Sequence, residues 1–222
     1  MPGLTIPIIS VHTPKAAGTT FLQQLRIVFG EENLLLDYSD DPADNSSRWN
    51  IDPEFFGLDS AFSIAPYRVV HGHFHPAKYN KLDEAFRMTF LRHPIDNVTS
   101  IFRFWSTNPS GMWRSPLFRY FKENKLSVQR LAMLPAIRFL YSQTYFGGFD
   151  MSRFDFVGDY SDYPGELKRL GGRLGVEFDL ALRLNVTLAI QGKNLQVDSP
   201  DSFALSDILA EDIRFYERYA GK

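Results

Sequence analysis

Short apolar runs, rich in β-branched and aromatic residues, recur along the chain and predict buried strands. The four clearest runs occupy residues 6–11, 67–74, 87–91 and 154–159. After the first run, apolar residues return at helical spacing, at Phe21, Leu25, Val28 and Phe29. Strands that alternate with helices in this way favour an α/β fold with a central, mainly parallel sheet.

Helical spacing also covers residues 95–104, 161–174 and 209–220. Gly175 is suited to end the second of these helices, and the last helix is expected to pack on the sheet. A further helical region covers residues 127–145, which Pro135 should kink or divide in two. Residues 37–50 are acidic and without periodicity, so we predict a surface loop there.

The turn between the first strand and the first helix has the composition of an anion-binding loop. Its sequence is Pro14-Lys15-Ala16-Ala17-Gly18-Thr19-Thr20. A helix that begins near Ala16 or Gly18 directs unpaired N–H groups and the positive end of its dipole toward a ligand. Lys15 adds a cation, and the two threonines add hydroxyl groups. The lysine precedes the glycine by three residues, so the pattern is not a Walker A motif, but it predicts binding of phosphate or sulfate.

Polar residues also follow the second and third predicted strands. His71 and His73 lie at the end of the second strand, and Arg92 follows the third. Because ligands collect at the carboxyl ends of parallel strands, we expect the histidines to lie where the anion-binding loop opens. Pro94 suits the first turn of the next helix. Ser100 follows on that helix, so Arg92 and Ser100 could reach one common anion.

Composition narrows the class of protein. The 222 residues fit a single α/β domain, spanning 1–222, with enough length for a substantial core. A net charge of −2 gives no sign of nucleic-acid binding, and the absence of cysteine excludes disulfides, thiolate metal sites and cysteine nucleophiles. The sequence shows no signal-peptide pattern and no apolar run that could span a bilayer. We therefore predict a soluble, cytoplasmic protein that binds neither nucleic acid nor a membrane.

These segments together resemble the sulfotransferases that use 3'-phosphoadenosine 5'-phosphosulfate (PAPS), particularly the branch related to heparan sulfate 2-O-sulfotransferase. The loop at 14–20 resembles the family's 5'-phosphosulfate-binding loop, and Arg92 with Pro94 and Ser100 resembles its 3'-phosphate-binding element. His71-Gly72-His73 resembles a His-Gly-His element in which histidine is the base. The resemblance implies a soluble bacterial member with a three-layer α/β/α, P-loop-like sulfotransferase fold.

The resemblance also implies the reaction and the role of each site residue. PAPS would donate a sulfuryl group to an acceptor hydroxyl, on a carbohydrate or a small molecule, and leave as 3'-phosphoadenosine 5'-phosphate (PAP), with no metal. His73 is the favoured base and His71 the second choice, since an ordinary histidine pKa of about 6.5 leaves the ring neutral yet basic. Lys15 would stabilise charge on the leaving phosphate, which Thr19, Thr20 and the backbone from Ala16 to Gly18 also hold. Arg92 and Ser100 would hold the 3'-phosphate.

Three other functions remain open at this stage. His71, His73 and His75 alternate and could bind a metal ion, although no carboxylate or cysteine completes the ligand shell. A nucleotide kinase on a similar scaffold would need a Walker B aspartate, and no convincing one is found. The third alternative is a nucleotide- or glycan-binding module without catalytic activity.

A dense aromatic region lies between residues 102 and 121, and it has two interpretations. Its members are Phe102, Phe104, Trp105, Trp113, Phe118, Tyr120 and Phe121. Interleaved with arginines, they could wall or cover an acceptor such as a sugar. Packing between two helices explains them equally well, and no motif in the chain identifies the acceptor or the oligomeric state.

Overall fold

The computed structural model describes residues 6–39, 41, 64–107, 115–182 and 205–221. Five parallel strands form one sheet in the order β2-β3-β1-β4-β5. The strands are β1 (Ile8–Val11), β2 (Leu34–Asp37), β3 (Val69–Gly72), β4 (Phe86–Leu91) and β5 (Phe156–Asp159). The predicted α/β fold with a parallel sheet is therefore confirmed. The edge strand β2 was not predicted.

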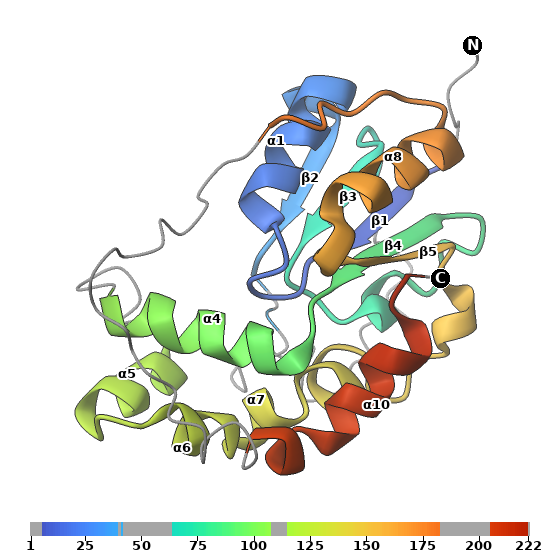
Figure 1. Ribbon diagram of the computed structural model, residues 1–222. Coiled ribbons are helices and arrows are strands. Elements are labelled where there is room, and N and C mark those ends of the chain that lie inside the picture. The colour runs from blue at the N-terminus through green and yellow to red at the C-terminus, as the bar shows by residue number, and fades with distance from the viewer. Residues whose placement is uncertain (1–5, 40, 42–63, 108–114, 183–204, 222) are drawn as a thin grey trace.

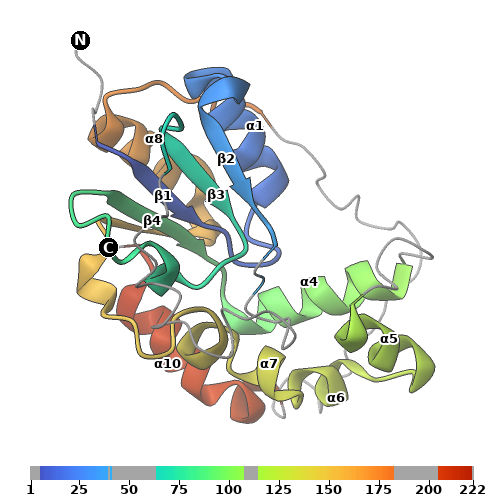
Figure 2. The same cartoon turned by 180° about the vertical axis from the view of Figure 1, so that it is seen from behind.

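Helices cover both faces of the sheet. The longer helices are α1 (Gly18–Phe29), α4 (Pro94–Thr107), α5 (Pro116–Glu123), α8 (Tyr163–Leu174) and α10 (Ala210–Tyr219). Shorter ones are α6 (Val128–Ala132), α7 (Pro135–Arg138), the π-helix η3 (Leu140–Tyr145), and the 3-10 turns η1 (Glu31–Asn33), η2 (Pro76–Tyr79), η4 (Met151–Arg153) and η5 (Tyr160–Asp162). Figures 1 and 2 show α1 and α8 on one side of the sheet, with α4, α7 and α10 on the other.

The strands divide their side chains between two hydrophobic cores. Ile8 and Val69 pack on the side of α1 and α8, whereas Ile9 and Val70 pack on the side of α4 and the C-terminal helices. Neighbouring residues separate in this way because successive side chains of a strand point to opposite faces. The three layers predicted from the sequence are thus observed, with each strand buried on both faces.

The C-terminal half of the second layer differs in part from expectation. Pro135 begins α7 and divides the predicted helical region, and Gly175 ends α8 with φ 66°, both as expected. The C-terminal helix α10 was expected to pack on the sheet, but its main contacts are with η3 and α4. The reason is that η3 and α4 already cover the sheet there, so α10 packs on them and reaches β5 through a hydrogen bond from Tyr216 to Asp159.

The aromatic region is mainly core. Phe102, Trp105, Phe118 and Phe121 pack edge to face with ring centroids 5.5–5.7 Å apart. This geometry is the favourable one for aromatic pairs. Tyr120 and Phe104 are exposed, and Trp113 lies outside the described residues. Core packing therefore accounts for four of these aromatics, and Phe104 contacts Lys15 in the site described below.

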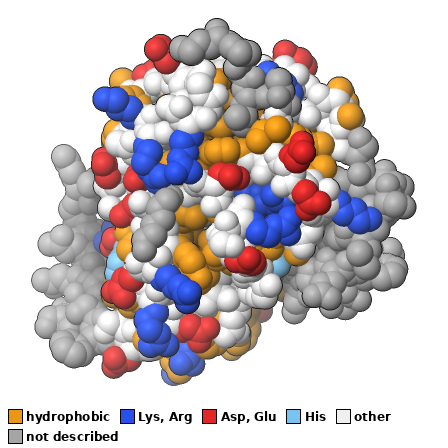
Figure 3. All heavy atoms as spheres, turned by 90° about the vertical axis from the view of Figure 1, so that its right-hand side faces the viewer, with side chains coloured by type: hydrophobic (Ala, Val, Ile, Leu, Met, Phe, Trp, Pro, Cys, Tyr) orange, Lys and Arg blue, Asp and Glu red, His pale blue; other side chains and the backbone are white. Residues whose placement is uncertain are grey.

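The surface and the helices add two observations. On the face drawn in Figure 3, lysine and arginine side chains lie among aspartate and glutamate side chains, in keeping with the small net charge. Among the helices in the described part of the chain, we find none with the length and apolar character that crossing a membrane requires.

Asp37 was predicted to begin a surface loop, and this was wrong: it ends β2 and is buried. Its Oδ2 accepts a hydrogen bond from Tyr79 Oη at 2.7 Å and lies 2.7 Å from Lys78 Nζ. Acidic composition suggested solvent, but a buried carboxylate is tolerated when it is paired and hydrogen-bonded. Most of the remaining predicted loop, 42–50, lies outside the described residues.

Gly72 gives a stability prediction, because β2 leaves no room for a side chain there. A Cβ at position 72 would lie 1.7 Å from the backbone oxygen of Asp37. We expect Gly72→Ala to lower the free energy of unfolding by about 1 to 3 kcal/mol, the range for overpacked sites. Gly172→Ala, in α8 with nothing within 4 Å, should instead raise it by about 0.5 to 1 kcal/mol. Urea denaturation of both variants measures this, and equal stabilities would refute the packing argument.

Candidate functional site

The anion-binding loop connects β1 to α1 through two unusual backbone conformations. Lys15 and Ala17 have φ of 60° and 61°, in the left-handed region that costs a non-glycine residue about 1 to 3 kcal/mol. The helix was predicted to begin near Ala16 or Gly18; it begins at Gly18, and Ala17 precedes it without a side-chain capping bond. The first turn of α1 therefore presents its N-terminus to the loop with no capping side chain in the way.

Hydrogen bonds with β4, with α4 and with Arg92 between them hold three successive residues at the start of this loop, from Thr13 to Lys15. Thr13 Oγ1 donates to the Phe90 carbonyl at 2.9 Å, and Asn97 Nδ2 donates to the Pro14 carbonyl at 2.7 Å. Arg92 Nη1 donates to the Lys15 carbonyl at 3.3 Å. Because these partners fix the loop backbone, its geometry is set before any ligand arrives.

Lys15 and Arg92, predicted on separate elements, lie side by side. Lys15 Nζ is 4.1 Å from the centroid of the Phe104 ring, and the Arg92 guanidinium carbon is 4.9 Å from that of Tyr160. Burial, and then the charge of Arg92, lower the pKa of Lys15 below its ordinary value. Two neighbouring cations repel each other, so an anion between them would be stabilised by both.

Ser100 lies on the face of α4 that meets the loop. Asn97 and Phe104 on this helix both contact loop residues, at Pro14 and Lys15. Ser100 is three residues after Asn97 and four before Phe104, and such residues are neighbours on one helical face. The helix therefore presents the Ser100 hydroxyl on the same side as the loop.

His71 is enclosed beside β1. It pairs with Ser10 across the parallel strands, and its Nδ1 lies 2.9 Å from Ser10 Oγ. Burial, and then the nearby His73, lower the pKa of His71 to about 3. The ring is therefore neutral throughout the physiological range and lies deeper than His73.

His73 is held in the tautomer that a general base requires. Its Nδ1 lies 2.7 Å from the His12 carbonyl oxygen and 2.9 Å from Tyr145 Oη. Since a carbonyl oxygen can only accept, Nδ1 carries the proton and Nε2 keeps the lone pair. Tyr145 Oη donates in turn to Asp41 at 3.2 Å. Burial lowers the pKa of His73, against the opposing effects of Asp41 and the bond to His12.

The third alternating histidine, His75, does not join the other two. Its Nε2 lies 3.0 Å from the Gly147 carbonyl, and its Nδ1 accepts from the Ala77 amide at 3.2 Å. Both nitrogens are thus used by backbone groups, which is why a site built from His71, His73 and His75 does not form. Across the described ranges, no group of three histidine, cysteine or acidic residues is arranged to hold a metal ion.

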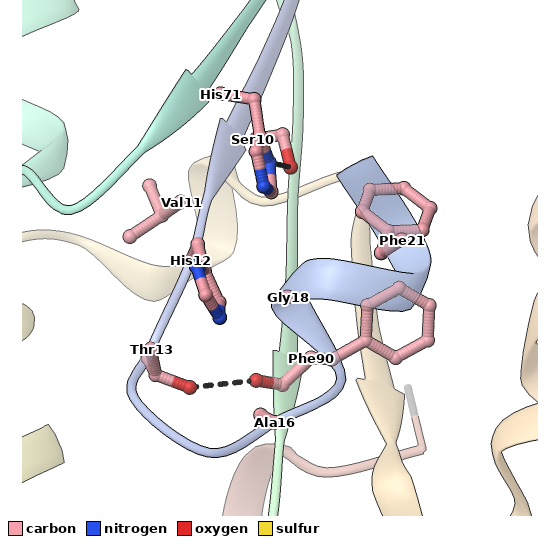
Figure 4. Close-up of a pocket in the computed structure, with 9 residues that line it drawn as sticks. All are labelled: Ser10, Val11, His12, Thr13, Ala16, Gly18, Phe21, His71 and Phe90. Atoms are coloured by element: carbon pink, nitrogen blue, oxygen red, sulfur yellow. Dashed lines mark hydrogen bonds between the residues drawn. The ribbon is translucent and has the colours of Figure 1, made fainter. Parts of the chain in front are cut away.

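His12 belongs to none of the predicted motifs, yet its ring lies inside the loop (Figure 4). The ring stacks on His73 with centroids 4.5 Å apart and on His71 with centroids 5.3 Å apart. A Cβ at position 18 would lie 1.7 Å from His12 Cε1, so only glycine fits there. One signal was available: Ser10 and His12 are two residues apart, which places them on one side of β1 and its extension.

The π-helix η3 contributes two further residues that no sequence motif indicated. Tyr141 Oη donates to the Arg92 carbonyl at 2.9 Å, and Tyr145 contacts His73. Asp212 of α10 is buried and accepts from the amides of Tyr141 and Ser142, each at 2.9 Å. The C-terminal helix thereby fixes the turn that supports both the arginine and the candidate base.

Comparison with known proteins gives similarity in three dimensions and none in sequence. Neither the protein-family models nor the curated proteins include a match to this chain. Mouse sulfotransferase SULT7A1, solved in complex with PAP, aligns with a TM-score of 0.48 at 12% identity, over 94% of this chain and 85% of its own. A sulfotransferase from Alicyclobacillus acidocaldarius aligns with a TM-score of 0.39 at 12% identity, over 97% and 100% of the two chains.

Proposed function

We propose that the protein is a PAPS-dependent sulfotransferase that transfers a sulfuryl group to a hydroxyl of a carbohydrate or a small molecule. One observation carries the proposal: His73 is bonded through Nδ1 to the carbonyl of His12, two residues before the anion-binding loop. The His12 carbonyl therefore connects a neutral base, whose Nε2 keeps its lone pair, to the anion-binding loop. Acyl or phosphoryl transfer to an alcohol needs similar parts, and the choice of PAPS follows from the second cationic position at Arg92.

The reaction assigns one task to each group. His73 Nε2 takes the proton of the acceptor hydroxyl while the acceptor oxygen bonds to sulfur. The bond from sulfur to the 5'-phosphate oxygen breaks, and its electron pair stays on the phosphate of departing PAP. Lys15 and the N-terminus of α1 stabilise the charge that grows on this oxygen.

Lys15 must leave the Phe104 ring in order to act. Phe104 is 39% exposed, and a cation–π contact at an exposed site is worth only about 0.5 to 1 kcal/mol. An ion contact with a phosphate in a partly enclosed site exceeds this, so donor binding would draw Nζ from the ring to the bridging oxygen. Thr19 and Thr20 on the first turn of α1 would add hydroxyl donors to the same phosphate.

Arg92 and Ser100 are the proposed ligands of the 3'-phosphate. Arg92 follows β4 and donates to the Lys15 carbonyl, and Ser100 shares a face of α4 with Asn97, which contacts the loop at Pro14. A nucleotide with phosphates at both the 5' and the 3' positions would bridge the two cations. A nucleotide without the 3'-phosphate would leave Arg92 unused.

The test is calorimetric titration of the wild type and Arg92→Ala with PAP and ADP. We expect wild type to prefer PAP, and Arg92→Ala to lose about 10- to 100-fold in PAP affinity, since hydrogen bonds to charged groups contribute about 1.5 to 3 kcal/mol. ADP affinity should change far less. Arg26→Ala, which removes an exposed ion pair with Glu31 at the far end of α1, should leave both affinities unchanged.

Other outcomes identify the rival functions. Tighter binding of ATP with Mg²⁺ than of PAP would favour a kinase. PAP binding without sulfuryl transfer to any acceptor in a panel of sugars, phenols and alcohols, assayed with ³⁵S-labelled PAPS, would favour a binding module. Transfer to sugars alone would establish the carbohydrate as acceptor.

A further inference from the structure

His12 carries two polar atoms that the folded chain leaves unsatisfied. Its Nδ1 and Nε2 are both buried and make no hydrogen bond to any described residue. A buried polar atom without a partner costs about 1 to 3 kcal/mol, and such atoms are rare in folded proteins. Thr13, the next residue in the chain, has its side-chain hydroxyl bonded to Phe90. The neighbouring His71 also has an unpartnered Nε2, but its Nδ1 lies 2.9 Å from Ser10 Oγ, whereas both ring nitrogens of His12 lack a partner.

Hydrogen bonds hold the His12 backbone, and packing places its ring beside the start of α1. The amide donates to the Gly72 carbonyl at 2.8 Å, and the carbonyl accepts from His73 Nδ1 at 2.7 Å. The ring itself lies against the start of α1, since a Cβ at position 18 would be 1.7 Å from His12 Cε1. Figure 4 shows the ring between the Thr13 side of the loop and Gly18.

The surroundings of the His12 ring favour a hydrogen-bond partner that is an anion. Burial, and then the charges of His73, His71 and Lys15, lower the pKa of His12 far below its ordinary value. The ring is therefore neutral, and one of its two nitrogens carries an N–H group whichever tautomer is present. Beside it lies the uncapped N-terminus of the 12-residue helix α1, which favours an anion. An anionic oxygen is thus the acceptor that this N–H group lacks.

We propose that His12 is a ligand of the donor anion. Its ring N–H donates a hydrogen bond to an oxygen of the 5'-phosphosulfate held at the start of α1. This inference rests on the proposed function and extends it. His12 would then bind the donor through its ring and the base His73 through its carbonyl oxygen. One residue would fix the distance between the base and the sulfur atom.

The test combines a side-chain change with a ligand change. His12→Phe keeps an aromatic ring between His71 and His73 but removes both nitrogens. We expect it to bind PAP about 10- to 100-fold more weakly than wild type, and to bind adenosine 3'-monophosphate, which lacks the 5'-phosphate, equally well. Calorimetry with the two ligands measures both affinities. Equal losses for both ligands would show a merely structural role and overturn the proposal.

Stability and partial rescue provide independent readouts. Without ligand, His12→Phe should have a melting temperature equal to or above that of wild type, because it removes two unsatisfied polar atoms. His12→Asn and His12→Gln restore an N–H donor at the positions of Nδ1 and Nε2, and one of them should recover part of the PAP affinity. A clear fall in the melting temperature of His12→Phe would mean that water already satisfies the ring, against the proposal.

The results distinguish a failure of the proposed role of His12 from a failure of the proposed function. If wild type fails to bind PAP more tightly than adenosine 3'-monophosphate, the loop does not hold a 5'-phosphate and the proposed function fails. If wild type does show this preference and His12→Phe keeps it in full, the function stands and the role of His12 is refuted.

Discussion

Replacing His73 with asparagine is expected to lower the rate of sulfuryl transfer about 10²- to 10⁴-fold, the range for loss of a general base, with PAP affinity unchanged. The asparagine amide nitrogen can take the place of Nδ1 and donate to the His12 carbonyl, so the loop keeps its support. The lone pair of Nε2 has no counterpart in asparagine. The variant therefore removes the base alone, and a ³⁵S transfer assay beside PAP calorimetry measures both quantities.

His75→Asn is the matched control for this experiment. Its side-chain oxygen can still accept from the Ala77 amide, and its only certain loss is the bond to the Gly147 carbonyl. It lies two residues from His73 but uses both nitrogens for backbone contacts, so transfer should stay near the wild-type rate. Equal activity of His73→Asn and wild type, or equal losses in the two variants, would remove His73 from the mechanism.

The pH dependence of the wild-type rate gives a second readout for His73. Only the neutral ring can accept a proton, and burial lowers the pKa of His73 below its ordinary value of 6.5. The neutral form therefore persists to more acidic pH than for an exposed histidine. We expect kcat/KM to be flat around neutral pH and to fall only below about pH 6.5. A fall with a midpoint above 7 would contradict this environment.

The sequence predicted the parts of the fold that depend on local pattern. Four strands, and a start of α1 near Ala16 or Gly18, follow from apolar runs and turn composition. The edge strand β2 was missed because its four residues follow α1 after the short turn η1 and because Asp37 looked like a loop residue. The burial of Asp37 depends on Lys78 and Tyr79, which lie about 40 residues further along the chain. A local sequence pattern cannot indicate such contacts.

Candidate site residues were predictable where they follow strands. Lys15, His73 and Arg92 each come after a different parallel strand, and the carboxyl ends of such strands share one edge of the sheet. Tyr145, Asp41 and Asp212 were not predictable, because their roles come from tertiary contacts of a π-helix and a C-terminal helix. His12 precedes the motif by two residues, and its unsatisfied nitrogens are seen only in the three-dimensional structure.

The supporting contacts explain why the C-terminal helix matters to a site formed near the N-terminus. Asp212 accepts three hydrogen bonds from η3, two from backbone amides and one from the Ser142 hydroxyl at 2.7 Å. The same π-helix presents Tyr145 to His73. π-Helices occur frequently at functional sites, and here the wider turn brings two tyrosines four residues apart to different parts of one site. The geometry around His73, the candidate base, is therefore set by elements from both ends of the chain.

Replacing Lys15 with methionine is expected to lower kcat about 10²- to 10³-fold, the effect of removing one donor that stabilises transition-state charge. Methionine keeps a flexible chain of similar length that can still lie on Phe104, so the loop should keep its shape. PAP affinity should fall much less than kcat, because charge on the bridging oxygen grows as the sulfur–oxygen bond breaks.

Lys125→Met is the matched control for this last experiment. Lys125 is also a lysine with left-handed backbone, at φ 48°, but it is exposed between α5 and α6. The same substitution there repeats the change in side chain and backbone strain without touching the loop, so kcat should not change. If Lys15→Met instead lost PAP affinity and kept kcat, Lys15 would bind the ground state only, and the N-terminus of α1 with His12 would have to stabilise the leaving phosphate.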